Sequence, residues 1–130
     1  DNDVRHWLVP RGGVVSSFVR VDERGDVTDF FSYYNLPSTI INHPKHDTLR
    51  AAYSFYTVPQ TVSAEELLRT ALICAKHEGY DVFNSLNLLD HHEKILQNLK
   101  FGMGDGHLQF YVYNYRAPSM PANMVGLVLL

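Results

Sequence analysis

Residues 13–36 read GVVSSFVRVDERGDVTDFFSYYNL, in which two runs rich in β-branched and aromatic residues flank the polar stretch DERGD. Runs of this composition on either side of a polar turn are typical of β-strands. Gly25 lies inside the turn stretch, where a glycine tolerates backbone angles that other residues avoid. We therefore predict strands over residues 13–21 and 27–36, joined as a hairpin.

The hairpin is followed by a loop and by further strand signals. Pro37, Asn42 and Pro44 interrupt any regular element after the hairpin. Residues 49–58, LRAAYSFYTV, predict a third strand, although Tyr56 is out of phase with the other aromatic residues. Residues 81–89, DVFNSLNLL, predict a short buried strand.

Two helices lie between and after these strands. SAEELLRTALICAKHEGY, residues 63–80, begins with Ser63 as a cap and Glu66 as its capping-box partner, and Gly79 can end the helix. Its apolar residues follow helical spacing; they are Leu67, Leu68, Ala71, Leu72 and Ala75. A second helix over residues 91–99 is predicted to be capped by Asp90 with Glu93. Its apolar stripe consists of Ile95, Leu96 and Leu99.

The last part of the chain contains two more strand patterns. HLQFYVYNYR, residues 107–116, alternates between two sets of side chains, and one set carries Tyr111, Tyr113 and Tyr115. NMVGLVLL, residues 123–130, is a continuous apolar run. This order of elements predicts one domain over residues 1–130 of the α/β (α+β) class, a mixed sheet with helices packed on it.

Composition excludes several kinds of protein. The chain has 130 residues, of which 45% are hydrophobic and 19% charged, as expected of a globular domain. A net charge of −3 provides no basic field, so nucleic acid is not expected as a partner. Because no apolar run approaches the roughly 18 residues of a membrane helix, no membrane span is expected. The single cysteine, Cys74, fits a reducing compartment, and we expect a cytoplasmic protein.

The seven histidines first suggest a metal site. His43 and His46 are three residues apart but lie in a proline-containing loop, while His91 and His92 are adjacent at a helix start and point in different directions. Neither pair has an acidic or cysteine partner at ligand spacing. No metal is therefore expected.

The end of the chain, PANMVGLVLL, is unusually apolar for a terminus. A continuous apolar strand is typically buried on both faces, which would hold the carboxylate of Leu130 inside the protein. A buried anion is costly unless it is paired, hydrogen-bonded or protonated, so such a charge would have a function. The alternative is a strand whose tip reaches water.

The glycine-rich stretch KFGMGDG, residues 100–106, is the next most informative. Alternate glycines let the backbone approach a ligand or adopt positive φ angles. Asp105 would repel a phosphate, so an acidic loop that grips a peptide suits the charge better than a phosphate cradle. A simple turn from helix to strand remains the alternative.

These residues carry a resemblance to a known family. KFGMGDG, the tyrosine-rich run after it and the ending VGLVLL resemble the C-terminal half of glycylpeptide N-tetradecanoyltransferase, the N-myristoyltransferase family. VTDFFSYYNLPSTI, TLRAAYSFY, GYDVFNSL and FYVYNYRAPSM resemble that family in the same order, so the resemblance covers essentially all 130 residues. The K-F-G-x-G-D-G pattern is a highly specific signature of the family.

The resemblance implies a fold of two fused acetyltransferase-like (GNAT) halves that transfers myristate from myristoyl-CoA to the amine of an N-terminal glycine. It implies that the acyl-CoA-binding N-terminal half is absent from this chain. This half would bind no cofactor itself, would provide most of the groove for glycine peptides, and would be inactive alone. It implies that the terminal carboxylate, here on Leu130, is the catalytic base. The implied peptide contacts are Ser38, Tyr53, Asn84, Gly104, Asp105, Gly106 and Leu129.

Two other functions remain open from the residues. A stand-alone acetyltransferase of the GNAT type would need a glycine-containing acyl-CoA loop opening a helix, and the best helix opens with SAEELL instead. A non-enzymatic interaction module could dock its apolar C-terminus into a partner by strand addition.

Overall fold

The hairpin predicted from residues 13–36 is present in the computed structural model, which describes residues 2–88, 91–109, 111–121 and 124–125. Strands β1 (Val15–Val21) and β2 (Val27–Asn35) pair antiparallel, with Phe18 opposite Phe31. In the turn, Gly25 has a φ of 87°, in the left-handed region that favours glycine. The carboxylate of Asp22 accepts hydrogen bonds from the backbone N–H groups of Arg24 and Asp26, at 2.8 and 2.9 Å.

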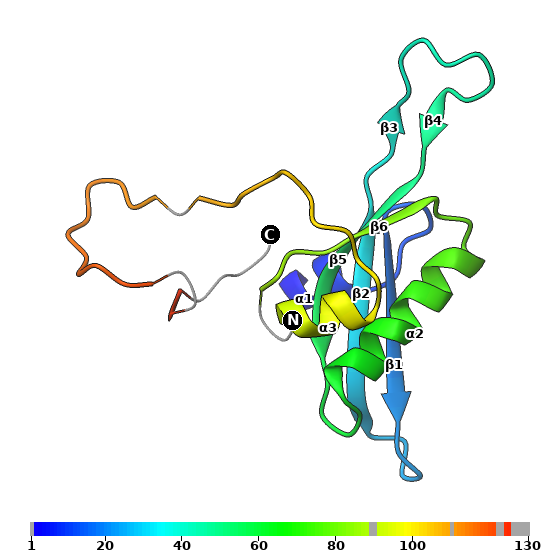
Figure 1. The fold of residues 1–130 in the computed structure, drawn as a ribbon. Coiled ribbons are helices and arrows are strands. Elements are labelled where there is room, and N and C mark those ends of the chain that lie inside the picture. The colour runs from blue at the N-terminus through cyan, green and yellow to red at the C-terminus, as the bar shows by residue number, and fades with distance from the viewer. Residues whose placement is uncertain (1, 89–90, 110, 122–123, 126–130) are drawn as a thin grey trace.

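Two further strands complete a sheet in the order β1-β2-β5-β6 (Figure 1). β5 (Ala51–Val58) pairs antiparallel with β2, and β6 (Val82–Asn84) pairs parallel with β5. The connection between the parallel strands contains helix α2 (Ala64–His77), as parallel neighbours require a crossover. The mixed, mostly antiparallel sheet with helices matches the predicted fold class.

Helix α2 has the predicted start and stop signals. The Ser63 hydroxyl accepts a hydrogen bond from the backbone N–H of Glu66 at 3.1 Å, which satisfies one of the free donors at the helix start. After the last turn, Gly79 adopts a φ of 79° and its N–H bonds to the carbonyl of Lys76. The buried face of α2 supplies Leu67, Leu68, Ala71 and Ala75.

The core lies between the sheet and the helices. Buried residues of β2, β5 and α2 form one cluster, with Tyr33, Ala52 and Leu68 at 0% exposure. The predicted apolar stripe of helix α3 (Glu93–Asn98) packs partly buried against that cluster. Burying apolar surface in this way is the main favourable contribution to folding. Figure 1 shows α2 and α3 on the same face of the sheet.

A bulge interrupts the pairing of β2 with β5. Phe31 is opposite Thr57 and Tyr33 is opposite Ser54, so two steps along β2 correspond to three along β5. The backbone N–H of Tyr56 is bonded to the Ser32 hydroxyl at 3.2 Å. The extra residue explains why Tyr56 is out of phase in the sequence, because a bulge shifts the alternation of faces by one position.

Several elements differ from the sequence predictions. Helix α1 (Asn2–Leu8) and the small sheet of β3 (Ser38–Thr39) and β4 (Thr48–Leu49) were not predicted. The residue before α3 is His92, which makes no side-chain cap hydrogen bond, and Asp90 lies outside the described residues. β6 is shorter than predicted and is not buried, because Val82 is exposed and its neighbours in the strand are half-buried.

The strand predicted over residues 107–116 is wrong for the part that the structure describes. Residues 107–109 and 111–116 have no regular secondary structure and are exposed. A strand needs a neighbouring ladder for its backbone groups, and none is paired with these residues. Of the strand predicted over 123–130, residues 124–125 are not in a strand and the others lie outside the described residues.

Candidate functional site

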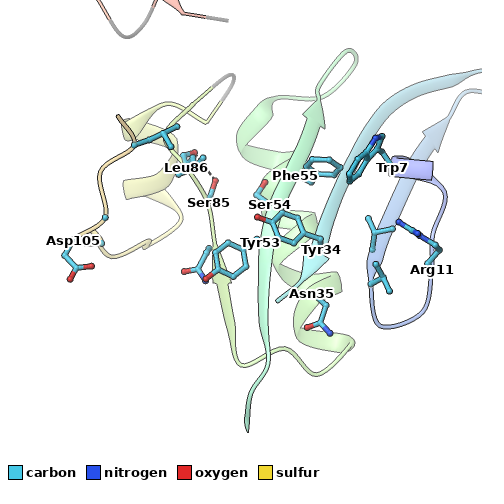
Figure 2. A pocket seen from close by; sticks show the side chains of 16 residues that line it. Trp7, Arg11, Tyr34, Asn35, Tyr53, Ser54, Phe55, Ser85, Leu86 and Asp105 are labelled. Carbon is cyan, nitrogen blue, oxygen red and sulfur yellow. Dashed lines mark hydrogen bonds between the residues drawn. The ribbon is translucent and has the colours of Figure 1, made fainter. Parts of the chain in front are cut away.

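The main groove lies on the face of the sheet that α2 does not cover. Tyr33 and Ala52 point into the core, so their strand neighbours Tyr34 and Tyr53 point to the opposite face. There they line a cavity of about 920 Å³ (Figure 2). A volume of this size is typical of ligand-binding clefts.

Aromatic side chains form the floor of this groove. The rings of Tyr34 and Tyr53 are stacked with centroids 5.5 Å apart, and Phe55 meets Tyr34 edge to face at 5.8 Å. Burial, and to a lesser extent the neighbouring Tyr53, raises the pKa of Tyr34 above its usual value, so its hydroxyl stays neutral. Such a floor offers apolar surface together with phenol groups that can hydrogen-bond a peptide.

The first wall follows strand β6. Asn84, Ser85 and Leu86 line the groove directly after the parallel pairing of β6 with β5. The Ser85 hydroxyl donates to the carbonyl of Leu86 at 3.1 Å and lies 2.7 Å from Nδ1 of His91. Asn84 is opposite Tyr53 in the register of β5 and β6, so its amide lies beside the aromatic floor.

The second wall is the glycine loop. Gly104, Asp105 and Gly106 line the groove and are exposed, and Figure 2 shows the Asp105 carboxylate beyond the β6 wall. None of the loop glycines has a positive φ, and a side-chain carbon built on each would meet nothing within 4 Å. Of the two roles that alternate glycines allow, a positive φ is therefore not adopted here, and close approach of the backbone to a ligand is the role that stays a prediction. The left-handed residue in this part of the chain is Lys100, with a φ of 64°.

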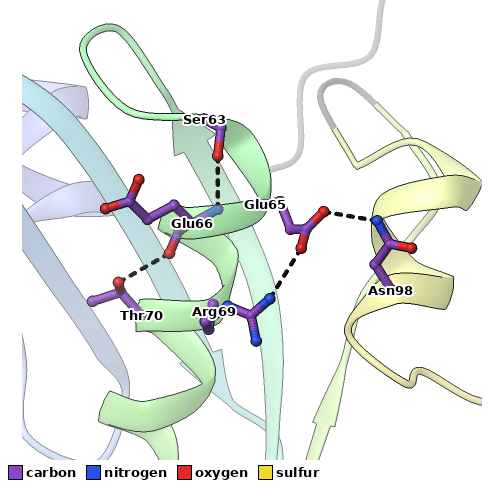
Figure 3. Close-up of polar contacts among 6 residues, drawn as sticks. All are labelled: Ser63, Glu65, Glu66, Arg69, Thr70 and Asn98. Carbon is purple, nitrogen blue, oxygen red and sulfur yellow. Dashed lines mark hydrogen bonds and ion pairs between the residues drawn. The ribbon is translucent and has the colours of Figure 1, made fainter.

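Polar contacts between α2 and α3 stabilise the segment that leads into the glycine loop (Figure 3). Glu65 at the start of α2 forms an ion pair with Arg69 at 3.0 Å and accepts a hydrogen bond from the Asn98 side chain at 2.8 Å. Asn98 is the last residue of α3, directly before the turn that leads into the loop. The bond from Asn98 therefore links the segment before the glycine loop to the start of helix α2.

Residues near the N-terminus close the opposite end of the groove. Trp7 of α1 contacts the Phe55 ring edge to face at 6.4 Å, and Arg11 lies beside it (Figure 2). The sequence analysis missed both residues. α1 contributes no buried residue, but Val4, Trp7 and Leu8 follow the i, i+3, i+4 spacing of an amphipathic helix. That spacing could have indicated the helix, although not its place at the groove.

The predicted site residues fall into three groups. Tyr53, Asn84, Gly104, Asp105 and Gly106 are brought together in the groove. Ser38 is exposed in β3, opposite Leu49 of β4, and does not line this groove. Leu129 and Leu130 lie outside the described residues.

The histidines do not form a recognisable metal centre within the described parts of the chain. No group of three His, Cys, Asp or Glu side chains there could hold an ion. His43 and His46 have ring centroids 5.0 Å apart, and Nδ1 of His43 accepts hydrogen bonds from the backbone N–H groups of Lys45 and His46. This pair therefore shapes the loop between β3 and β4.

Over the described residues, every helix is too short or too polar to cross a bilayer.

The fold is that of an acetyltransferase-like domain. A similar solved structure is glucosamine-6-phosphate N-acetyltransferase from Arabidopsis thaliana, with a TM-score of 0.53 and 13% identity over 87% of this chain and 73% of that chain. At this identity the similarity shows the fold alone.

Sequence similarity then defines the family, and the chain belongs to the N-myristoyltransferases. The family described as "Myristoyl-CoA:protein N-myristoyltransferase, C-terminal domain" matches residues 1–127. Glycylpeptide N-tetradecanoyltransferase 1 of Arabidopsis thaliana is 53% identical over 133 residues, covering 100% of this chain and 30% of that protein. The crystal structure of Saccharomyces cerevisiae N-myristoyltransferase with bound myristoyl-CoA has a TM-score of 0.66 and 32% identity, covering 80% of this chain and 30% of that chain.

These findings confirm the resemblance seen in the sequence. They also show that the chain spans only part of its relatives, 26% of the zebrafish and 32% of the Dictyostelium discoideum glycylpeptide N-tetradecanoyltransferase.

Proposed function

We propose that residues 1–130 are the peptide-binding part of an enzyme that transfers myristate from myristoyl-CoA to the amine of an N-terminal glycine. The observation that carries this proposal is the groove of a family member in which Tyr53, Asn84 and the Gly104–Gly106 loop converge. The acyl-CoA-binding part would be supplied by residues other than these, so the chain alone would be inactive. A reducing compartment such as the cytoplasm suits the free thiol of Cys74.

The groove suits an extended peptide with a free amino end. Its aromatic floor buries apolar parts of a peptide, while the Asn84 amide and the backbone of the glycine loop can bond its polar groups. Asp105 adds a negative charge at one wall. A basic side chain a few residues after the glycine would pair with that charge.

The terminal carboxylate of Leu130 would act as the general base. A glycine ammonium has a pKa near 8 and a terminal carboxylate one near 3.5, so proton transfer between them is uphill by roughly 6 kcal/mol in water. Burial raises the pKa of the carboxylate and lowers that of the amine, which narrows the difference. The resulting neutral amine can then attack the thioester.

The base is tested by moving the charge. One alanine added after Leu130 in the full enzyme displaces the carboxylate by a residue, and we expect turnover to fall at least about 100-fold while the thermal midpoint is unchanged. The matched control is Leu130→Val, which keeps the carboxylate in place and should retain most activity. Normal turnover by the extended enzyme would refute the role given to Leu130.

The acidic wall is tested by neutralising Asp105. For Asp105→Asn we expect the preference for a basic over a neutral peptide, measured as the ratio of kcat/KM values, to drop about two- to fivefold, as for a partly exposed ion pair. Glu23→Gln, in the β1–β2 turn, removes the same charge far from the groove and should leave the ratio unchanged. An unaltered ratio in Asp105→Asn would leave the loop with a backbone role only.

A further inference from the structure

His91 is a buried histidine that the proposed mechanism does not use. It lies before α3 and is 6% exposed. Its Nδ1 lies 2.7 Å from the Ser85 hydroxyl on the groove wall, and its Nε2 lies 3.0 Å from the Thr57 hydroxyl on β5. One imidazole ring thus connects the start of α3 to the segment after β6 and to β5, whose Thr57 is 34 residues away in the sequence.

Each ring nitrogen of His91 has a hydroxyl partner, whichever nitrogen carries the proton. With the proton on Nδ1, the ring donates to the Ser85 oxygen, whose O–H bonds the carbonyl of Leu86 at 3.1 Å, and Nε2 accepts the Thr57 O–H. With the proton on Nε2, the Ser85 O–H donates to Nδ1 and the ring donates to the Thr57 oxygen. Both arrangements bond the ring to β5 on one side and to the groove wall on the other.

These contacts join the β6 wall of the groove to the floor strand β5, on the side of the sheet that the helices cover. Thr57 belongs to the strand that also supplies Tyr53 and Phe55, whereas Ser85 belongs to the wall after β6. His91 also precedes the short helix α3, beyond which the glycine loop begins. The backbone N–H of Phe101 bonds to the Leu96 carbonyl at 2.9 Å, so the loop is attached to this helix.

We propose that His91 is a positioning residue, whose imidazole holds the wall at Ser85 and the start of α3 at a fixed distance from the β5 floor and thereby sets the affinity of the groove for peptide. This inference rests on the proposed peptide-binding function. A ring that only filled space would affect stability but not the balance between peptide and acyl-CoA kinetics.

The kinetic test uses the full enzyme. We expect His91→Phe, which keeps an aromatic ring but loses both nitrogens, to raise the peptide KM about five- to tenfold, as for one or two lost hydrogen bonds. Both kcat and the KM for myristoyl-CoA should stay within about twofold of wild type. The exposed neighbour gives the matched control, since His92 makes no side-chain cap bond and His92→Phe should change nothing.

Smaller substitutions keep the test decisive if His91→Phe fails to fold. Ser85→Ala removes only the hydroxyl on the wall, and we expect it to raise the peptide KM about threefold. His91→Asn retains an N–H near the position of Nδ1 and should recover part of the affinity lost in His91→Phe. A peptide KM unchanged in Ser85→Ala and in whichever His91 variants fold would overturn the proposal.

A second measurement does not depend on catalysis. Amide exchange in the full enzyme should rise in β6 and α3 but not in β1 when Ser85 is replaced by alanine. Unchanged exchange in β6 and α3 would refute the positioning role. If the wild-type enzyme transferred no myristate, the proposed function would fail while amide exchange still decided the role of His91.

Discussion

Strand β5 and residues 107–116 have similar sequence patterns but different structures. Both segments alternate and both are rich in tyrosine or phenylalanine. β5 lies between β2 and β6, and Ala52 within it is fully buried. In the other segment Tyr111, Tyr113 and Tyr115 are 75–94% exposed, and Figure 1 shows this part of the chain extending away from the sheet. Alternation therefore indicates which residues can form a strand, whereas the neighbouring strands decide whether they do.

The largest expected effect is on stability and comes from replacing a buried core residue rather than an exposed one. Leu68 is fully buried in the core, so Leu68→Ala should lower the free energy of unfolding by about 2–5 kcal/mol through lost burial and the cavity left behind. Tyr113→Ala removes a larger side chain that is 94% exposed and should change it by less than about 0.5 kcal/mol. Urea denaturation of both variants measures the difference. Similar losses in the two would show that residues 107–116 are packed after all.

Residues 59–62, directly after β5, are held in place by hydrogen bonds without belonging to a strand. Asp29 of β2 is buried, and its carboxylate accepts hydrogen bonds from the backbone N–H groups of Gln60 and Thr61, both at 2.8 Å. The hydroxyls of Thr28 and Thr61 also donate to it. Burial alone would raise the pKa of Asp29, but these hydrogen bonds outweigh it and hold the pKa well below its usual range.

The sign of the pH dependence follows from that lowered pKa. The ionised carboxylate stabilises the fold above its unfolded pKa of about 4, and this contribution is lost as the pH falls towards the folded pKa. Asp29→Asn should therefore lower the urea midpoint most at pH 7, by less at pH 3, and by progressively less as the pH falls further. Asp26→Asn, in the exposed turn, serves as the control. Equal losses for Asp29→Asn at both pH values would contradict the role of the charge.

A smaller effect on stability is expected at the start of helix α2. Ser63→Ala removes the capping hydroxyl and should cost about 1 kcal/mol of unfolding free energy. Thr70→Ala is a matched control, because the Thr70 hydroxyl only bonds the Glu66 carbonyl within the helix (Figure 3) and its loss should cost little. Thermal unfolding distinguishes the two variants. A Thr70→Ala loss as large as that of Ser63→Ala would argue against the cap.

The smallest effect lies at the boundary between the packed and exposed regions. Lys100 ends α3 with a φ of 64°, which glycine adopts at lower cost, so Lys100→Gly should stabilise the chain by about 0.5 kcal/mol after the added freedom of the unfolded chain is counted. Lys94→Gly, inside α3, should instead destabilise by about 1 kcal/mol. The thermal midpoint should rise for Lys100→Gly and fall for Lys94→Gly. A fall in both variants would show that Lys100 is not strained.

Elements that depend on nearby residues could be predicted from the sequence. The β1–β2 turn, the Ser63 cap and the apolar face of α2 each rest on side chains a few positions apart. The β3–β4 pairing gave no comparable signal because it buries little apolar surface, and the helical spacing of Val4, Trp7 and Leu8 in α1 was missed. The strand predicted over 107–116 was wrong because its periodicity carried no information about a partner.

The candidate site shows the same division. Tyr53, Asn84 and Asp105 were named from the family resemblance, since nothing in their spacing shows that they line one groove. Trp7 and Arg11 were missed because their position depends on where α1 lies against β1 and Phe55. The aromatic residue out of phase at position 56 was a genuine local signal, and the structure explains it as a bulge.

Because of that extra residue, the odd-numbered side chains at the two ends of β5 point to opposite faces of the sheet. By simple alternation Thr57 would follow Tyr53 and Phe55 onto the groove face, but it is opposite the core residue Phe31 and so faces the helices. One strand can therefore present aromatic rings to a ligand and a hydroxyl to His91 on the other side. Deleting one of residues 54–56 would restore simple alternation, so the strand could keep its aromatic face or the Thr57 hydroxyl directed at His91, but not both.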